Sequence, residues 1–216
     1  VLQMAVSSLG TFYNLEVSPE QVKGKKYNKD YFMNTSAALI GSLGSVVAAW
    51  HQIRSDKEPI ASNQDSTYAE NFLLMLGAEN ITPLMTRIMD ATLVLHGEHT
   101  INASTFTAMV TSSTLANASQ VVASAIGSLS GPLHGGANEK VVSMLSKIDS
   151  KEDIRPWLDD TLKAKNVVWG MGHREYSVKD PRANILTEMV QELFNERDGG
   201  VTDIFEKAIE LEKACE

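Results

Sequence analysis

Apolar residues recur at intervals of three and four positions along most of this chain, and runs that alternate with a period of two are sparse. The first pattern is typical of helices with one buried face. We therefore expect an all-α, multi-helical fold. The predicted helices span 1–9, 28–54, 68–76, 82–98, 139–145, 150–165, 184–196 and 203–214, and another begins at Ser18 with Pro19 in its first turn.

Residues 33–50 carry no charged side chain, and this length requires that a membrane span be considered. Hydroxyl, amide and glycine residues make the segment too polar for the lipid interior. We interpret it instead as a buried helix whose small residues permit close approach of a neighbouring helix, and we expect no membrane association. These residues are Asn34, Thr35, Ser36, Gly41, Ser42, Gly44 and Ser45.

A second uncharged stretch covers residues 100–138, which contain no Asp, Glu, Lys or Arg and are rich in Ala and Ser. Helices that are apolar or small on all sides are usually buried. Such surfaces often face a second subunit, so this stretch predicts a homodimer.

Composition narrows the possible functions. The formal net charge is −8 without a basic stripe, which argues against nucleic acid as a partner. The single cysteine, Cys215, excludes an internal disulfide and fits a reducing compartment. Because Cys215 is nearly terminal and has no histidine near it in sequence, and because no G-x-S-x-G motif occurs, we do not expect thiol or serine nucleophilic catalysis.

The chemistry is concentrated in two motifs, 131–139 (GPLHGGANE) and 170–182 (GMGHREYSVKDPR). Each places a histidine, His134 or His173, beside glycines that allow the backbone to approach a ligand closely. Two imidazoles can polarise oxygens, and Arg182 can bind a carboxylate through two parallel hydrogen bonds. The motifs together predict a site for an anionic substrate with a carbonyl group.

A further histidine pair occurs in residues 96–99 (HGEH). If the helix predicted for 82–98 continues, His96 and His99 share a face, and a metal site has to be considered. Zinc usually needs a third protein ligand, and the H-E-x-x-H pattern is absent, so we expect no metal. Asn102, which follows closely with Ser104 and Thr105, either orients a substrate or caps a helix.

At these residues the chain resembles the citrate synthase family, in its bacterial-type branch, over nearly its whole length. The resemblance rests on the two motifs and on collinear segments at 68–73 (YAENFL), 95–99 (LHGEH) and 102–105 (NAST). It implies an almost entirely helical fold with a large domain that forms the dimer interface and a small domain that closes over the substrates. We expect residues 1–133 to belong to the large domain and 134–216 to the small one.

The resemblance also implies roles for individual residues. His134 would stabilise the enolate of acetyl-CoA, and His173 would polarise the carbonyl of oxaloacetate and donate a proton. His99 and Arg182 would bind oxaloacetate, with Asn102 as a further substrate-binding candidate. No permanently bound cofactor is implied, because coenzyme A enters as a substrate. Its binding residues would be Val168, Trp169, Gly170, Met171, Gly172 and Lys179.

Several residues of the family pattern are not found in this sequence. The catalytic aspartate and two substrate-binding arginines of the family are expected beyond Glu216, and the N-terminal part is expected before Val1. We therefore expect an internal fragment with little or no synthase activity alone. Ser177 stands where related enzymes often carry Lys or Arg near the coenzyme A phosphates, and Lys179 is a candidate to compensate.

Two other functions stay open from the sequence. The same motifs fit a 2-methylcitrate synthase that uses propionyl-CoA, and a chain that truly ends at Glu216 would fit a non-catalytic helical dimerisation module. The bacterial-type motifs favour the cytoplasm, although a mitochondrial location stays open because a transit segment would precede Val1.

Overall fold

A computed structural model describes residues 1–13, 29–172, 178–196 and 202–215, and these residues form helices and connecting turns with no strand among them. The all-α expectation is confirmed. The chain divides into two compact units, unit 1 (Val1–Ser130) and unit 2 (Gly131–Glu216). Their assignment to the expected large and small domains, with a boundary at 133/134, stays a prediction.

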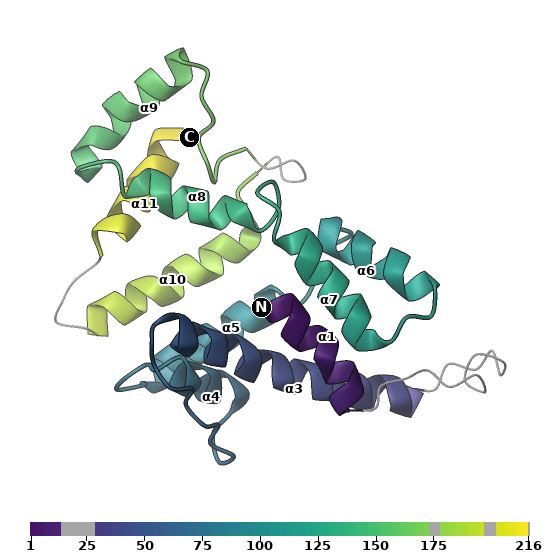
Figure 1. Ribbon diagram of the computed structural model, residues 1–216. Helices are drawn as coiled ribbons and strands as arrows, with labels where there is room; N and C mark the ends of the chain where they lie inside the picture. The colour runs from purple at the N-terminus through teal and green to yellow at the C-terminus, as the bar shows by residue number, and fades with distance from the viewer. Residues whose placement is uncertain (14–28, 173–177, 197–201, 216) are drawn as a thin grey trace. The chain divides into compact units, whose positions relative to one another are not determined.

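Unit 1 contains six described helices (Figure 1). Four of them begin at a Thr or Asn whose side chain accepts a backbone N–H of the first turn, as at Thr82, which precedes Pro83. The helix predicted to begin at Ser18 lies outside the described residues. The six helices are α1 (Leu2–Phe12), α3 (Lys29–Arg54), α4 (Tyr68–Met75), α5 (Pro83–Leu95), α6 (Ala103–Ser113) and α7 (Ala118–Leu129).

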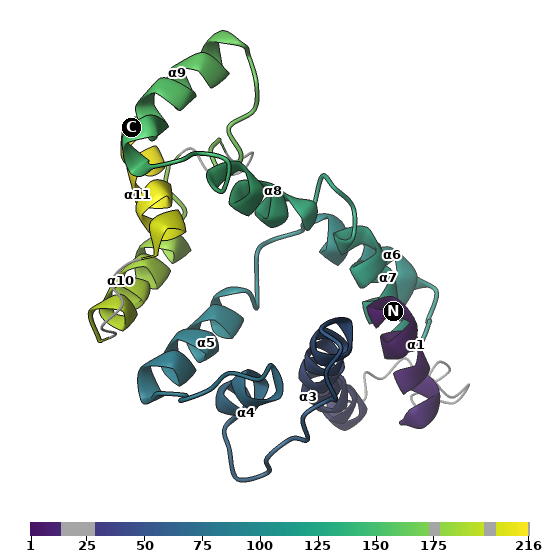
Figure 2. The ribbon, with the colours of Figure 1, turned by 60° about the vertical axis from the view of Figure 1, so that its left-hand side comes forward.

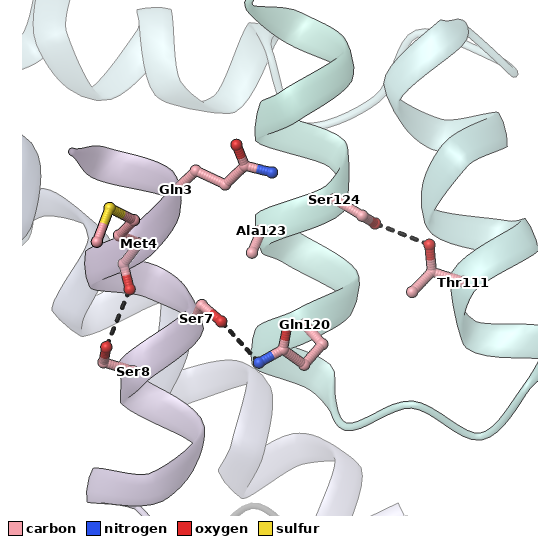
Figure 3. Close-up of a pocket in the computed structure, with 8 residues that line it drawn as sticks. All are labelled: Gln3, Met4, Ser7, Ser8, Thr111, Gln120, Ala123 and Ser124. Atoms are coloured by element: carbon pink, nitrogen blue, oxygen red, sulfur yellow. Dashed lines mark hydrogen bonds between the residues drawn. The ribbon is translucent and has the colours of Figure 1, made fainter.

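Helices α1, α7 and α6 lie side by side and are joined by hydroxyl and amide groups as well as by apolar contact (Figure 3). The Gln120 amide of α7 donates to Ser7 Oγ of α1 at 2.6 Å, and Thr111 Oγ1 of α6 lies 2.8 Å from Ser124 Oγ of α7. A Cβ on Gly10 would fall on Ser119 Oγ, so this glycine allows α1 to pack closely on α7. Helix α1 continues to Phe12, beyond the predicted end at 9.

Helix α3 buries one stripe of residues, and its other positions are half-buried or exposed, so the buried helix predicted at 33–50 is buried only in part. Its buried positions include Gly44, which packs beneath the Tyr68 ring, and Gln52, whose amide donates to the Met75 carbonyl at 3.1 Å. By length and composition alone the helix could cross a membrane, but the core helix of a soluble protein meets the same criterion. In this structure α3 contacts α4, α1 and α7.

The uncharged stretch 100–138 is less buried than its composition predicts. Helix α6 has no buried residue, and Phe106, Met109 and Val110 are 60%, 51% and 54% exposed. Helix α7 buries Ser119 and Ala123 against its neighbours. The apolar side chains of α6 therefore form a surface that this chain by itself leaves open to solvent.

Unit 2 is organised around a cluster of five buried side chains, Leu145, Ile148, Ile154, Leu158 and Leu211. Helix α11 packs on α9 and α8 around this cluster, as Figure 2 shows. Burial of a side chain such as Ile154, which is fully inaccessible to solvent, contributes about 1.5–3 kcal/mol. The described helices are α8 (Gly136–Leu145), η1 (Lys151–Asp153), α9 (Ile154–Lys163), α10 (Pro181–Glu196) and α11 (Asp203–Cys215).

The element predicted at 150–165 proves to be a short 3-10 turn, η1, followed by α9. The Asp153 carboxylate accepts hydrogen bonds from the backbone N–H and the hydroxyl of Ser150, which fixes the first turn. Helix α10 begins at Pro181, three positions before the predicted start at 184. Helices α3, α4, α8 and α11 begin or end close to their predicted limits, within the usual variation of helix boundaries, whereas no limits were predicted for α6 and α7.

The two glycines of α3 provide a matched pair of substitutions. Gly44→Ala is expected to lower the free energy of unfolding by about 1–3 kcal/mol. The new Cβ would lie 2.8 Å from Tyr68 Oη, which donates to the Ile40 carbonyl. Gly41→Ala meets no atom within 4 Å and is expected to stabilise by about 0.5–1 kcal/mol through helix propensity. Urea unfolding of both variants measures the difference, and equal effects would contradict the packing at Gly44.

Candidate functional site

The segment that carries His96 and His99 is a turn rather than a helical face. Helix α5 ends at Leu95, and His96 is its C-cap, with Nδ1 2.6 Å from the Thr92 carbonyl. Thr100 then adopts φ +51°. The predicted continuation to 98 is wrong, and the shared face of His96 and His99 does not exist. The helix ends here for a local reason. The main-chain N–H groups of His96 and Gly97 donate hydrogen bonds to carbonyls of the last helical turn.

No three His, Cys, Asp or Glu side chains gather in a way that could hold a metal ion within the part of the chain that the structure describes. The argument for a metal site at residues 96–99 required His96 and His99 to share a helical face, and they do not.

Asn102 and Ser104, which follow His99, form hydrogen bonds within unit 1. Asn102 caps α6, with its Oδ1 accepting from the Thr105 N–H at 2.9 Å. The Ser104 hydroxyl donates to the Ala125 carbonyl of α7 at 3.0 Å. The capping interpretation of Asn102 is therefore confirmed, while its role toward a substrate stays a prediction. These bonds fix the start of α6 next to the half-buried His99.

His134 lies in the turn immediately before α8 in unit 2. Its main-chain N–H donates to the Gly131 carbonyl at 3.0 Å, and Gly135 is the N-cap of α8. The imidazole is half-buried, whereas the side chain of the preceding Leu133 is 93% exposed. A neutral imidazole here can donate one hydrogen bond to a ligand oxygen.

Residues 168–172 form a loop that packs on α8. Val168 and Met171 contact the buried cluster of unit 2, and the Met171 N–H donates to the Val168 carbonyl at 3.3 Å. Gly170 and Gly172 have φ of +90° and +71°, which favour glycine. A Cβ on Gly170 would lie 3.2 Å from Cγ2 of Val141. The glycines thus allow the loop backbone to pass close to the helix.

Both described cations of the second motif are paired with carboxylates. The Arg182 guanidinium binds Asp180 through Nε at 3.0 Å and Nη2 at 2.7 Å, and Lys179 Nζ lies 2.7 Å from Oε1 of Glu212 on α11. The sequence of the motif holds Arg174, Lys179 and Arg182 within nine residues, but these pairs neutralise the charge of the two described cations. Asp180 also caps α10 by accepting the Arg182 N–H at 2.9 Å. His173 lies outside the described residues.

The predicted site residues thus fall into two groups. His99 and Asn102 belong to unit 1, whereas His134, 168–172, Lys179 and Arg182 belong to unit 2. Within unit 2, the His134 turn and the 168–172 loop both contact α8. Sequence reasoning missed three residues here: Lys140, Asp180 and Glu212. The Asp-Pro pair at 180–181 is a helix-start signal that predicts the cap, but nothing in the sequence pairs Glu212 with Lys179.

A pocket of about 570 Å³ lies in unit 1 between α1, α6 and α7 (Figure 3). It contains none of the predicted site residues and no titratable side chain, so it offers no acid–base chemistry. Its lining residues are Gln3, Met4, Ser7, Ser8, Thr111, Gln120, Ala123 and Ser124.

The thiol of Cys215 is also a poor candidate for chemistry. Desolvation raises its pKa, with Arg155 acting in the opposite direction, so the unreactive protonated form is favoured at neutral pH.

Comparison with known proteins relates this arrangement to one family. The family model for the citrate synthase C-terminal domain matches residues 1–216. A citrate synthase of Synechocystis is 43% identical over 215 residues, covering 100% of this chain and 52% of that protein. The chain spans about half the length of the curated relatives that it matches over nearly its whole extent.

Two solved structures share the fold over almost the whole chain. Citrate synthase from Pyrobaculum aerophilum is 30% identical, with a TM-score of 0.84, and the match covers 99% of this chain and 53% of that one. Citrate synthase from Thermoplasma acidophilum, in a ternary complex with carboxymethyl coenzyme A and oxaloacetate, is 25% identical, with a TM-score of 0.79. The match covers 98% of this chain and 53% of that one.

The pairing at the start of α10 can be tested by two substitutions at one position. Asp180→Ala removes both the cap and the partner of Arg182 and is expected to cost about 1–2 kcal/mol of unfolding free energy. Asp180→Asn keeps a capping oxygen and is expected to cost clearly less. Asp160→Ala, at an exposed ion pair in α9, is the control and should change stability by about 0.5 kcal/mol or less. Equal losses for Asn and Ala would contradict the capping role.

Proposed function

Because this chain belongs to the citrate synthase family, we propose that it supplies substrate-binding and catalytic residues of a citrate synthase. The enzyme would condense acetyl-CoA with oxaloacetate and hydrolyse citryl-CoA to citrate and coenzyme A. The observation that carries this proposal is the position of His134 in a glycine-rich turn at the start of α8, beside the helix on which the 168–172 loop packs.

His134 is suited to stabilise an enolate. The methyl protons of acetyl-CoA are weakly acidic, so a base removes one only if the developing oxygen charge is stabilised at the same time. A half-buried imidazole at the start of α8 can donate a hydrogen bond to that oxygen. The carboxylate base is a separate role, for which we propose no residue of this chain.

Oxaloacetate would be bound by His99, Asn102, His173 and Arg182, with His173 polarising its carbonyl. The Asp180 contacts support this role for Arg182, because they orient the guanidinium before a substrate carboxylate arrives. The related citrate synthase from Thermoplasma acidophilum, which was solved with oxaloacetate and a coenzyme A derivative, gives further support. Closure of the small domain over the substrates would shield the reaction from water.

Coenzyme A would be bound by the 168–172 loop and Lys179. Gly172, whose Cβ position has no atom within 4 Å, leaves the loop backbone open where an adenine could approach. Lys179 would have to exchange its carboxylate partner, Glu212, for a phosphate. No permanently bound cofactor takes part in the proposed reaction.

The proposed assembly is a homodimer in the cytoplasm. The exposed apolar side chains of α6 support self-association, because contiguous apolar surface of this kind is characteristic of subunit interfaces. Bacterial relatives that match nearly all of the chain support the compartment.

The proposed reaction is tested by citrate formation in the intact protein, measured as coenzyme A release with each acyl-CoA and oxaloacetate. We expect turnover with acetyl-CoA, and His134→Gln is expected to lower kcat by about 100- to 1,000-fold, since it removes one donor to the enolate oxygen. Faster turnover with propionyl-CoA would favour a 2-methylcitrate synthase. Absence of turnover with both would favour the non-catalytic dimerisation module.

The proposed dimer surface is tested separately by Met109→Glu, which places a charge in the middle of the exposed face of α6. We expect a shift from dimer to monomer in analytical ultracentrifugation, because an unpaired charge is costly to bury at an interface. Leu162→Glu, on the exposed side of α9 in unit 2, is the matched control and should leave the dimer intact. A dimer that persists in the Met109 variant would exclude this face.

A further inference from the structure

Lys140, in the second turn of α8, contacts both segments that carry the predicted chemistry of unit 2. Its Nζ lies 4.0 Å from the centroid of the Trp169 ring, within the 168–172 loop. The same Nζ donates to the Pro132 carbonyl at 3.4 Å, in the turn that carries His134. One ammonium group thus joins two segments that lie more than thirty residues apart in the sequence.

The helix places this side chain correctly for both contacts. Side chains on a helix lean toward its N-terminus, so Lys140 points back toward the turn that precedes Gly136. Its neighbour Val141 meets the loop at Gly170, where a Cβ would lie 3.2 Å from Cγ2. The loop therefore crosses α8 at residues 140 and 141. An indole is the aromatic ring that binds a cation best.

The turn around His134 has one backbone hydrogen bond of ordinary length, from the His134 N–H to the Gly131 carbonyl at 3.0 Å. The bonds from Gly136 to Gly131 and from Ala137 to His134 are long, at 3.4 and 3.5 Å. Glycines at 131, 135 and 136 give the chain many accessible backbone conformations. The Lys140 ammonium group, 3.4 Å from the Pro132 carbonyl, adds a further contact of similar length close to the imidazole.

We propose that Lys140 is a positioning residue that couples the 168–172 loop to the turn carrying His134. Loss of its charge releases both segments at once, although they are far apart in the chain sequence. The consequence for catalysis rests on the proposed function: coenzyme A bound at the loop would favour the His134 orientation that stabilises the enolate.

The coupling is measured first without turnover, by hydrogen exchange of the intact protein in the absence of ligands. Lys140→Met keeps the apolar stem and removes the ammonium group, and it is expected to speed exchange about three- to tenfold in both 131–137 and 168–172. Lys140→Arg keeps a cation and a donor and should restore wild-type exchange. Lys147→Met, which removes an exposed lysine just after α8, is the control and should change neither segment.

Steady-state kinetics then test the consequence for the reaction. Lys140→Met is expected to raise KM for acetyl-CoA and to lower kcat, each about three- to tenfold, with rescue by arginine and no effect of Lys147→Met. Faster exchange in only one of the two segments, or in neither, would overturn the coupling. So would a salt-dependent rise in KM with unchanged exchange, because it would indicate direct phosphate binding by Lys140. A wild-type protein that forms no citrate would contradict the proposed function, while the exchange measurement would still decide the coupling.

Discussion

The close passage of the 168–172 loop over α8 is the constraint on which the chemistry of unit 2 depends. Gly170 can approach Val141 only because it lacks a Cβ and adopts a positive φ. The approach brings Val168 and Met171 onto the buried cluster and the Trp169 ring to Lys140. The loop therefore derives its position from the hydrophobic core rather than from its own few hydrogen bonds.

The positive charges of Lys179 and Arg182, in the 170–182 motif of the same unit, are balanced by carboxylates. Arg182 and Lys179 each have a carboxylate partner, and both pairs are about one-third exposed. Water screens such pairs, so their contribution to stability is modest. Their main effect is on geometry, because each fixes a flexible cationic side chain relative to α10 or α11. An anionic ligand would meet preoriented cations instead of a diffuse positive patch.

Unit 1 achieves close helix packing with small and hydroxylated residues. Serine, threonine and glutamine side chains join α1, α7 and α6, and glycines allow the helix axes to approach. This packing uses no charged residues, in agreement with the uncharged sequence of residues 100–138. Much of α6 is nevertheless exposed. The composition that predicts burial within one chain is equally compatible with burial between two chains.

The sequence alone determined the all-α class, most helix starts and the identity of the motifs, because these depend on local periodicity, caps and residue type. Thr82-Pro83 illustrates this, since the Thr82 cap bonds a backbone N–H within three residues, whereas for Asn102 the sequence left capping and substrate binding open. Only the tertiary structure decided that α5 ends at Leu95, that α3 buries a single stripe, and that Lys140, Asp180 and Glu212 have the contacts described. The physical reason is distance along the chain. Residues such as Lys179 and Glu212 come into contact only after the core between them has folded, and no local sequence pattern predicts that contact.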